Sequence, residues 1–324
     1  MWLRIDPFSY VLIEIPIVKI KLRIGIASHI VLDNLEGFDG GVTESVGGPP
    51  CYSGITCRRF GFDVSLATKV GKDFPADAHR LLDNEKILLQ QRHFVDEPTT
   101  RFSISATNSS RRLSLQSKCA PLNASDIENM KVDCWLVSPV YDEVPDELLK
   151  DIKAHGGSKD FIMLDPQGYV RTADVSGNIS LREKIDLDVS GIRAIKTDLH
   201  EMSAITGGLV GIDGMLALQA RGIEFVVSTI PNEIHLLYQK THYWAKLDEI
   251  AATDSTGAGD ILSGAFTCAY LKEKDPLWAL CFGAGAVRAA LETREKGLDK
   301  IPSYSRIEEG ASYFYNTIGF KQLS

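Results

Sequence analysis

The sequence lacks the signatures of several common classes of protein. Its six cysteines form no C-x-x-C pair and show no metal-ligand spacing, so we expect reduced thiols in a cytoplasmic protein. His200-Glu201 lacks the second histidine of H-E-x-x-H, which argues against zinc. No G-x-G-x-x-G follows the first predicted strand, and no Walker-type G-x-x-x-x-G-K-[ST] occurs. These absences disfavour an NAD-dependent dehydrogenase and a P-loop kinase.

The sequence also lacks a basic excess and a long apolar run. It carries 35 lysines and arginines against 43 acidic residues, so we expect no nucleic acid and no anionic membrane as partner. The apolar stretch 8–22 is interrupted by a glutamate, a proline and two lysines, which makes it unsuitable as a membrane span. We expect residues 1–21 to be an extension that adds an edge strand, or one that results from an upstream start codon.

The patterns in the remaining residues, 22–324, predict one large α/β domain. A chain of 324 residues with 44% hydrophobic and 24% charged residues has an ordinary globular composition. Short apolar runs alternate with helical patterns, which predicts a mostly parallel sheet covered on both faces. The predicted strands include 22–27, 132–137, 161–164, 192–195 and 225–228, and the helices between them include 146–155, 201–206 and 213–220.

Two alternating segments, 101–106 and 112–116, surround a polar turn at 107–110. Alternation around such a turn predicts a β-hairpin. The hairpin would either cover the mouth of a site as a lid or form a plain sheet edge.

The most informative stretch is Asp254-Ser255-Thr256-Gly257-Ala258-Gly259-Asp260, which leads directly into a helical pattern. Backbone N–H groups at the start of a helix have no intrahelical partner, and the helix dipole adds partial positive charge there. The turn therefore predicts a site for phosphate or developing negative charge. Asp260 would lie where a carboxylate can take a proton from a hydroxyl. The alternative is a glycine-rich turn with an acidic N-cap.

Three further features accompany this turn. Asp33 follows the first predicted strand, where ligands bind in open α/β sheets, although it could equally be a solvated loop acid. Gly47-Gly48 precedes a helix and would let a ligand approach the backbone. Small residues near Gly285 would let a neighbouring strand or the face of a base lie against the helix from Pro276 to about Glu292.

Taken together, these landmarks resemble the ribokinase-like, or PfkB-type, carbohydrate kinases. The resemblance rests on Gly47-Gly48 before a helix that ends in Arg58-Arg59-Phe60-Gly61, on residues 69–73 (KVGKD), and on the 254–260 turn. It covers roughly residues 22–300. It implies a ribokinase-like three-layer α/β/α fold with a mostly parallel central sheet and a small β-hairpin lid. The lid would comprise segments near 34–46, around Phe38, and 99–117, and its exposed strands could pair two subunits into a homodimer.

The resemblance also implies roles for individual residues. Asp260 would be the base that activates the acceptor hydroxyl, and Gly257, Ala258 and Gly259 would form the anion hole for the γ-phosphoryl group. Glu201 and Asp198 would order Mg²⁺, and a monovalent cation is a further implied cofactor. The implied acceptor contacts are Asp33, Gly47, Gly48, Tyr52, Arg101 and Gln167, and the implied ATP contacts are Lys196, Thr229, Asp254, Thr256, Gly257, Gly259 and Gly285.

The sequence departs from the family pattern at several places. Asp198 stands where the family usually has asparagine, Ser255 replaces threonine, and residues 227–232 replace a glycine-containing turn beside the nucleotide. Tyr52 occupies a position where sugar-specific members often carry asparagine, and it offers one hydroxyl and a ring face. Together with the stretch 164–171, Gly-Gly-Pro-x-x-Tyr is similar to the branch that includes myo-inositol kinases.

The leading hypothesis is therefore an ATP- and Mg²⁺-dependent kinase that phosphorylates a hydroxyl of a small sugar or polyol. One alternative is a nucleoside kinase on the same fold, in which Tyr52 and aromatic residues of the lid would stack a base. Another is a catalytically silent metabolite-binding protein. The intact Asp260 and its neighbouring glycines argue against a silent protein.

Overall fold

The computed structural model describes residues 21–36, 42–107, 110–155, 161–250 and 252–323. The predicted extension lies outside the described residues except for Lys21, and Phe38 and the tip of the predicted hairpin also lie outside them.

The main sheet has nine strands among the described residues, in the order β17-β16-β15-β14-β13-β10-β9-β1-β4. The strands from β4 to β14 are parallel, and β15, β16 and β17 extend the sheet in antiparallel fashion. This confirms the predicted mostly parallel sheet. The strands are β1 (Arg23–Ala27), β4 (Asp63–Ala67), β9 (Cys134–Val137), β10 (Phe161–Leu164), β13 (Ala194–Thr197), β14 (Phe225–Ile230), β15 (Glu233–Tyr238), β16 (Thr241–Lys246) and β17 (Gly319–Gln322).

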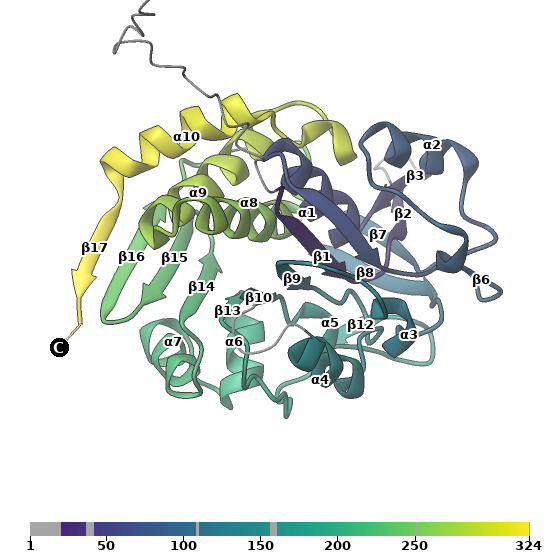
Figure 1. Cartoon of the computed structure of the whole chain (residues 1–324), viewed down its shortest axis with the longest axis horizontal. Coiled ribbons are helices and arrows are strands. Elements are labelled where there is room, and N and C mark those ends of the chain that lie inside the picture. The colour runs from purple at the N-terminus through teal and green to yellow at the C-terminus, as the bar shows by residue number, and fades with distance from the viewer. Residues whose placement is uncertain (1–20, 37–41, 108–109, 156–160, 251, 324) are drawn as a thin grey trace, which may run out of the picture.

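Helices cover both faces of this sheet and give three layers (Figure 1). The upper layer in that view contains α1 (Pro49–Arg59), α8 (Ala258–Glu273), α9 (Pro276–Glu292) and α10 (Tyr304–Thr317), and the lower layer contains α4 (Asp146–His155), α6 (Leu199–Thr206) and α7 (Gly211–Ala220). Because both faces are covered, the central strands are buried throughout, which explains their continuous apolar runs.

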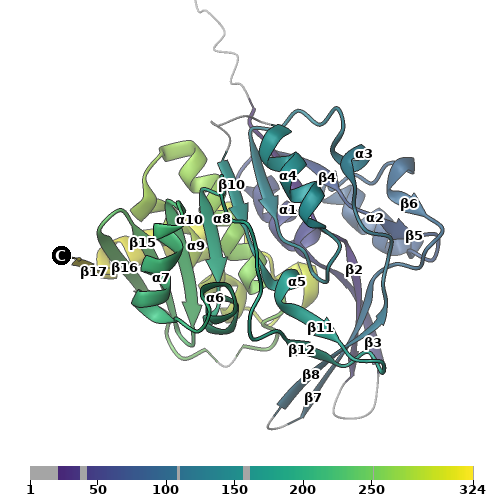
Figure 2. The same ribbon diagram turned by 90° about the horizontal axis from the view of Figure 1, so that it is seen from below.

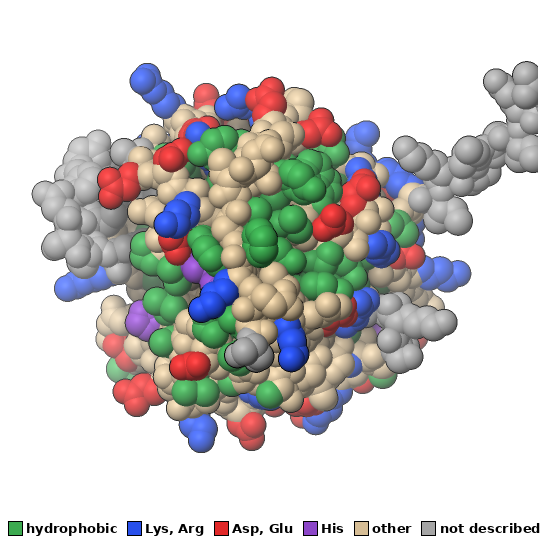
Figure 3. Space-filling model, turned by 90° about the vertical axis from the view of Figure 1, so that its left-hand side faces the viewer, with side chains coloured by type: hydrophobic (Ala, Val, Ile, Leu, Met, Phe, Trp, Pro, Cys, Tyr) green, Lys and Arg blue, Asp and Glu red, His purple; other side chains and the backbone are tan. Residues whose placement is uncertain are grey.

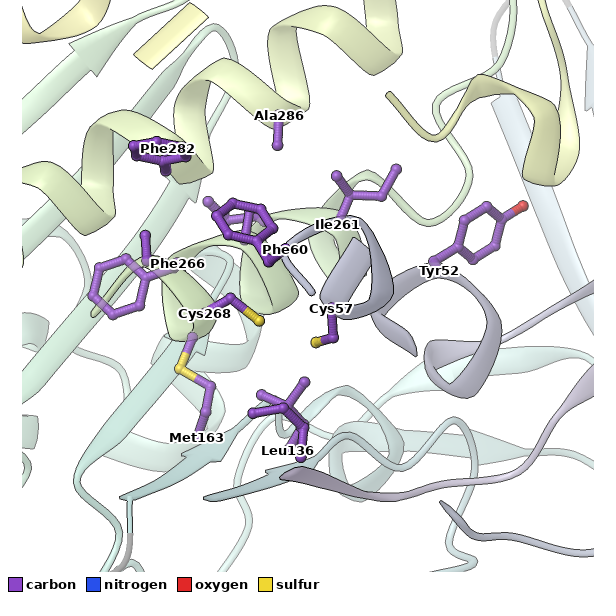
Figure 4. Packing of buried hydrophobic residues seen from close by; sticks show 14 of the residues in the cluster. Tyr52, Cys57, Phe60, Leu136, Met163, Ile261, Phe266, Cys268, Phe282 and Ala286 are labelled. Atoms are coloured by element: carbon purple, nitrogen blue, oxygen red, sulfur yellow. The ribbon is translucent and has the colours of Figure 1, made fainter. Parts of the chain in front are cut away.

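A large hydrophobic core lies between the sheet and the upper helices. Figure 4 shows Phe60, Phe266 and Phe282 packed together above Met163 and Leu136 of the strands, with Tyr52 at the margin of this packing. The small residues of α9 serve helix packing, because a Cβ atom at Gly285 would lie 2.6 Å from the backbone nitrogen of Ala311 in α10.

A separate four-stranded sheet has the order β3-β2-β7-β8, formed by β3 (Val42–Gly47), β2 (Val31–Glu36), β7 (Arg101–Thr107) and β8 (Ser110–Ser117). Figure 2 shows it apart from the main sheet. The predicted hairpin is its β7–β8 pair. Asp33 is therefore not in a loop, as predicted, but inside β2, between β3 and β7.

The other elements are short or lie at the periphery. The strands β11 (Arg171–Ala173) and β12 (Ile179–Leu181) form a two-stranded ribbon, and a bridge between Ser114 and Asn178 joins the turn of this ribbon to β8. The remaining elements are β5 (Val70–Gly71), β6 (Phe94–Val95), α2 (Ala76–Asn84), α3 (Ala124–Ile127), α5 (Gln167–Val170) and 3-10 turns at Gln91–His93 and Gly297–Lys300.

Figure 3 shows the side of the molecule where β17 ends the sheet, with acidic, basic and hydrophobic side chains interspersed over it. In the described part of the chain, no single helix is both long and apolar enough to cross a membrane, although the bent pair α6 and α7 meets that test when the two are taken together.

Candidate active site

The 254–260 turn presents backbone N–H groups at the start of α8. Gly257 has φ 74°, and a Cβ atom there would lie 2.4 Å from the ring of Tyr52, so only glycine fits. The Ala258 N–H donates to the Ser255 carbonyl at 3.2 Å. The described residues supply no acceptor for the N–H groups of Gly257, Gly259 and Asp260. Among the described residues, these three N–H groups are therefore open to an anion, while the N–H of Ala258, which belongs to the predicted set, donates within the turn.

Asp260 lies in the first turn of α8 and is only 8% exposed. The hydroxyl of Ser53 in α1 donates to its main-chain carbonyl at 2.8 Å and fastens it to the neighbouring helix. Burial and then the nearby Asp165 raise the pKa of the Asp260 carboxyl to about 7, against the opposing charges of Lys196 and Arg171. A carboxylate with a pKa near neutrality is suited to accept a proton in a reaction.

A buried lysine lies directly beside the turn. Lys196, at the end of β13, has its Nζ 2.9 Å from Asp165 Oδ2 and 3.9 Å from Glu201 Oε2. Burial disfavours its charge, but these two acids raise the pKa of Lys196. A Cβ atom at Gly259 would lie 3.1 Å from that Nζ, so a fixed positive charge stands next to the anion-binding backbone.

Asp198 and Glu201 form a reciprocal cap at the start of α6. Asp198 Oδ1 accepts from the Glu201 N–H, and Glu201 Oε2 accepts from the Asp198 N–H, both at 2.8 Å. Burial, Asp165 and Asp198 raise the pKa of Glu201 to about 7, with Lys196 opposing. Each carboxylate uses one oxygen in the cap. Among the described residues, no group of three or more His, Cys, Asp or Glu side chains is placed to hold a metal ion by itself.

A cleft of about 410 Å³, the polar cleft, opens between the small sheet and α8. Its wall includes Asp33 of β2 and Tyr52 of α1, and Gly48, whose φ of 88° brings it against the His29 carbonyl. On the opposite side, Arg171 donates to Gln167 Oε1 at 2.8 Å and to the Val140 carbonyl at 3.0 Å. The cleft therefore brings hydrogen-bonding groups from distant parts of the chain to face Asp260.

A second cleft of about 300 Å³, the aliphatic cleft, lies on the other side of the same helix start. Seven of its fifteen lining residues are large aliphatics: Ile230, Ile234, Leu247, Ile250, Leu262, Val287 and Leu291. Thr229 and Asn232 are neutral polar members, and Glu233 and Asp248 add two acids. Both clefts are lined by Lys196, Asp198, Ala258 and Gly259. The two clefts thus meet at the turn that presents the anion donors.

Four residues of the predicted site do not line either cleft: Gly47, Arg101, Asp254 and Gly285. Asp254 points into the fold, where it accepts from the Thr256 and Gly297 N–H groups. Arg101 contacts Glu44 and lies 3.6 Å from Asp73 instead. Gly285 lies in α9 and packs against α10. Gly48, Thr256 and Gly257 line the polar cleft, and Thr229 lines the aliphatic cleft. Gly47 lies just behind the polar cleft wall, where a Cβ atom would meet Asp33 and Tyr52.

Two acids near the site are not among the predicted site residues, although Asp165 belongs to the 164–171 stretch noted above. Asp165 follows β10 directly and is 2% exposed, a position at a strand end that a search for ligand-binding acids would find. Glu143 is fully buried and accepts from the backbone N–H groups of His29, Val140 and Tyr141 and from the Ser28 hydroxyl. It joins two segments that border the polar cleft, and no signal in the sequence marks it.

Comparison with known proteins agrees with this geometry. A family model described as pfkB family carbohydrate kinase matches residues 33–302. Among solved structures, a pyrophosphate-dependent kinase of the ribokinase family, complexed with a pyrophosphate analogue and myo-inositol, is 20% identical at a TM-score of 0.74, covering 89% of this chain and 99% of its own.

Two sugar kinases give similar values. The fructokinase from Vibrio cholerae O395 has 17% identity and a TM-score of 0.71, and the ribokinase from Thermotoga maritima has 19% and 0.69; each alignment covers 90% of this chain and 99% of the other. These similarities confirm the predicted three-layer fold. No curated protein sequence matches this chain.

Proposed function

The chain belongs to the pfkB family of carbohydrate kinases, and we propose that it transfers the γ-phosphoryl group of ATP, with Mg²⁺, to a hydroxyl of an uncharged polyol such as myo-inositol. Family membership indicates a phosphotransferase that acts on sugar hydroxyls. The observation that carries the finer proposal is the meeting of a polar and an aliphatic cleft at one helix start that holds Asp260. Each substrate would occupy one cleft.

In the proposed reaction, Asp260 accepts the proton of the acceptor hydroxyl as the hydroxyl oxygen attacks the γ-phosphorus, and the bond from that phosphorus to the bridging oxygen breaks to release ADP. The N–H groups of Gly257, Gly259 and Asp260 receive the charge on the transferring group, and the Lys196 ammonium stands beside them. Phosphoryl transfer depends mostly on positioning and on neutralising spread charge, and these groups supply both.

Asp198 and Glu201 fit the expected magnesium ion. Each has one carboxylate oxygen outside the reciprocal cap, and both line the polar cleft. Two carboxylates are fewer than an all-protein cage requires, and Mg²⁺ is usually held by one or two carboxylates together with water and substrate phosphates. When bound, the ion would neutralise phosphate charge. Asp198 in place of asparagine would give this protein a more acidic pair.

The aliphatic cleft favours a nucleotide over pyrophosphate as the donor. Pyrophosphate has no apolar part to bury, whereas a base and ribose would cover the aliphatic wall described above. The Thr229–Asn232 segment, which replaces the family's glycine-containing turn, contributes to this wall. Pyrophosphate remains the donor to test against ATP, because the pyrophosphate-dependent kinase named above is similar in fold.

The charges of the polar cleft favour an uncharged acceptor. Asp33, Asp165 and Asp260 line it together with the magnesium pair, against the cations of Arg171 and Lys196. A phosphorylated sugar would add negative charge to an acidic cleft, whereas hydroxyls can donate to its carboxylates and accept from Arg171. A nucleoside is the second candidate, because the rings of Tyr52 and Phe102 also line this cleft.

The small sheet is the proposed lid. Phe102 and Ile104 of β7 and Leu113 of β8 reach the polar cleft from it. Pairing of its edge strands between two subunits and a cytoplasmic location are further parts of the proposal; the six cysteines, all of them described, are buried and form no disulfide.

The test is a product screen with the purified protein. ATP and pyrophosphate are each offered with Mg²⁺ to inositols, pentoses, hexoses, hexose phosphates and nucleosides, and phosphorylated products are identified by ³¹P NMR. We expect product from ATP and a neutral polyol. Product only from pyrophosphate would overturn the donor assignment, product only from a nucleoside would replace the acceptor class, and no product would favour a silent binding protein.

A further inference from the structure

Lys300 is a fully buried lysine at the back of the 254–260 turn. Its Nζ lies 3.0 Å from Asp254 Oδ2 and donates to the Asp254 main-chain carbonyl, also at 3.0 Å. The Lys300 side chain is 0% exposed. Burying an ammonium group is unfavourable unless the surrounding groups compensate its charge. The phosphoryl-transfer chemistry described above does not use this lysine.

The ammonium is paired with the negative charge of Asp254 in the same turn. Asp254 shapes the turn by accepting from the Thr256 N–H at 2.8 Å and the Gly297 N–H at 3.0 Å. Its carboxylate therefore lies in the same turn that presents N–H groups to an anion. Like charges in a poorly solvated site repel one another strongly. The ion pair with Lys300 makes this end of the turn neutral.

Tyr52 connects the ammonium to the anion-binding backbone. The Lys300 Nζ lies 5.5 Å from the centre of the Tyr52 ring, within the range of a cation–π contact. The same ring packs so closely on Gly257 that a Cβ atom there would lie 2.4 Å from it. The Tyr52 ring thus contacts Lys300 on one side and Gly257 on the other, next to the first N–H groups of α8.

We infer that the Lys300 ammonium acts as an internal monovalent cation, which keeps the 254–260 turn neutral and shaped to bind the phosphoryl group. A carboxylate oxygen and a backbone carbonyl are also the ligands that hard cations such as K⁺ and Na⁺ take. The lysine, as part of the chain, therefore provides the positive charge that a K⁺ or Na⁺ ion from solution would otherwise provide. The enzyme would then need no free monovalent cation. The inference rests on the proposed kinase function.

The first test uses the unmodified protein. Turnover of ATP and the acceptor found in the screen is measured with Mg²⁺ in a buffer free of alkali cations, with KCl, NaCl or choline chloride added at equal ionic strength. We expect K⁺ and Na⁺ to change turnover by less than about twofold, because the turn already holds its positive charge. A rise of about tenfold or more with K⁺ would overturn the inference.

The second test removes the charge. We expect Lys300→Ala to lower turnover by about 10–100-fold and methylammonium chloride to restore part of it by entering the vacated space. Lys300→Met should lose as much turnover without restoration, because its side chain fills that space. Lys153→Met is the matched control and should keep normal turnover, since Lys153 of α4 forms a 2.8 Å ion pair with Asp188 and lines neither cleft.

The outcomes separate this inference from the proposed function. Unmodified protein that makes no product with any cation would contradict the proposed function. Product formation that requires K⁺, or normal turnover by Lys300→Met, would contradict only the role of Lys300. If both Lys300 variants fail to fold, the response of the unmodified protein to K⁺ decides the question.

Discussion

The 254–260 turn carries an aspartate at each end, and the two have opposite environments. Asp254 is held by two backbone N–H groups and by Lys300; although burial opposes it, these hydrogen bonds lower the pKa of its carboxyl. Asp260 faces the polar cleft among other acids, and burial raises its pKa to about 7. The same residue type is thus a structural anchor at one end and, in the proposed reaction, a proton acceptor at the other, because its partners differ.

The largest expected effect is the loss of turnover on substitution of Asp260. Asp260→Asn should lower turnover by about 10³–10⁴-fold, because the amide cannot accept the hydroxyl proton. ATP affinity should change little, since the amide keeps the shape of the carboxyl group and the anion donors are backbone groups. Steady-state kinetics and calorimetric titration with ATP measure the two quantities. Near-normal turnover by this variant would exclude Asp260 as the base.

A second substitution tests the wall that faces Asp260 across the polar cleft. Asp33→Ala should raise the KM for the acceptor by about 10–100-fold, because the acceptor hydroxyls lose a charged hydrogen-bond partner. The KM for ATP should remain within about twofold, since Asp33 does not line the aliphatic cleft. Asp213→Ala, an exposed aspartate on α7, is the control. Equal losses for both substrates would contradict the assignment.

The pH dependence of kcat/KM sharpens the comparison further. Asp260 must be deprotonated to act as base, so activity should fall about tenfold per pH unit below the pKa of about 7 and level off above it. Asp254 stays charged over this range because its pKa is lowered. A rate profile that is flat between about pH 5 and 8 would show that Asp260 does not titrate as the base.

The smallest expected effect is on the stability of the folded protein, and it has opposite signs for Asp254 and Asp260, at the two ends of the turn. The folded protein holds the Asp260 proton more tightly than the unfolded chain, so this group lowers stability as the pH rises from about 4 to about 7. Asp260→Asn should therefore raise the melting temperature at pH 8, and the gain should disappear near pH 4.

Asp254→Asn should instead lower the melting temperature at pH 8. It leaves the Lys300 ammonium buried without its countercharge, at an expected loss of about 3 kcal/mol. The stabilisation from Asp254 is present above about pH 4, the ordinary pKa of a free aspartate, and is lost as the pH falls through its lowered pKa. Thermal unfolding of both variants at pH 4 and pH 8 tests the pair, and shifts of the same sign at pH 8 would contradict the comparison.

Much of this arrangement could be predicted from local patterns. The layers followed from apolar runs, and the turn that opens α8 followed from glycines next to a helical pattern. Asp33 lines the polar cleft but lies inside β2 rather than after a strand, since its register depends on pairing with β7, about 70 residues away. Glu143 and Lys300 were not predicted, because their roles depend on contacts with Val140, His29 and Asp254 that only the folded chain creates.

The shared wall of the two clefts also has a kinetic consequence. Since Lys196 and Gly259 border both, a phosphoryl group can pass between the substrates without attachment to the protein. Both substrates must then be bound together before either product leaves, and the transfer is a single displacement. Initial-rate plots should intersect rather than run parallel, and a chiral γ-phosphoryl group should reach the product with inverted configuration at phosphorus.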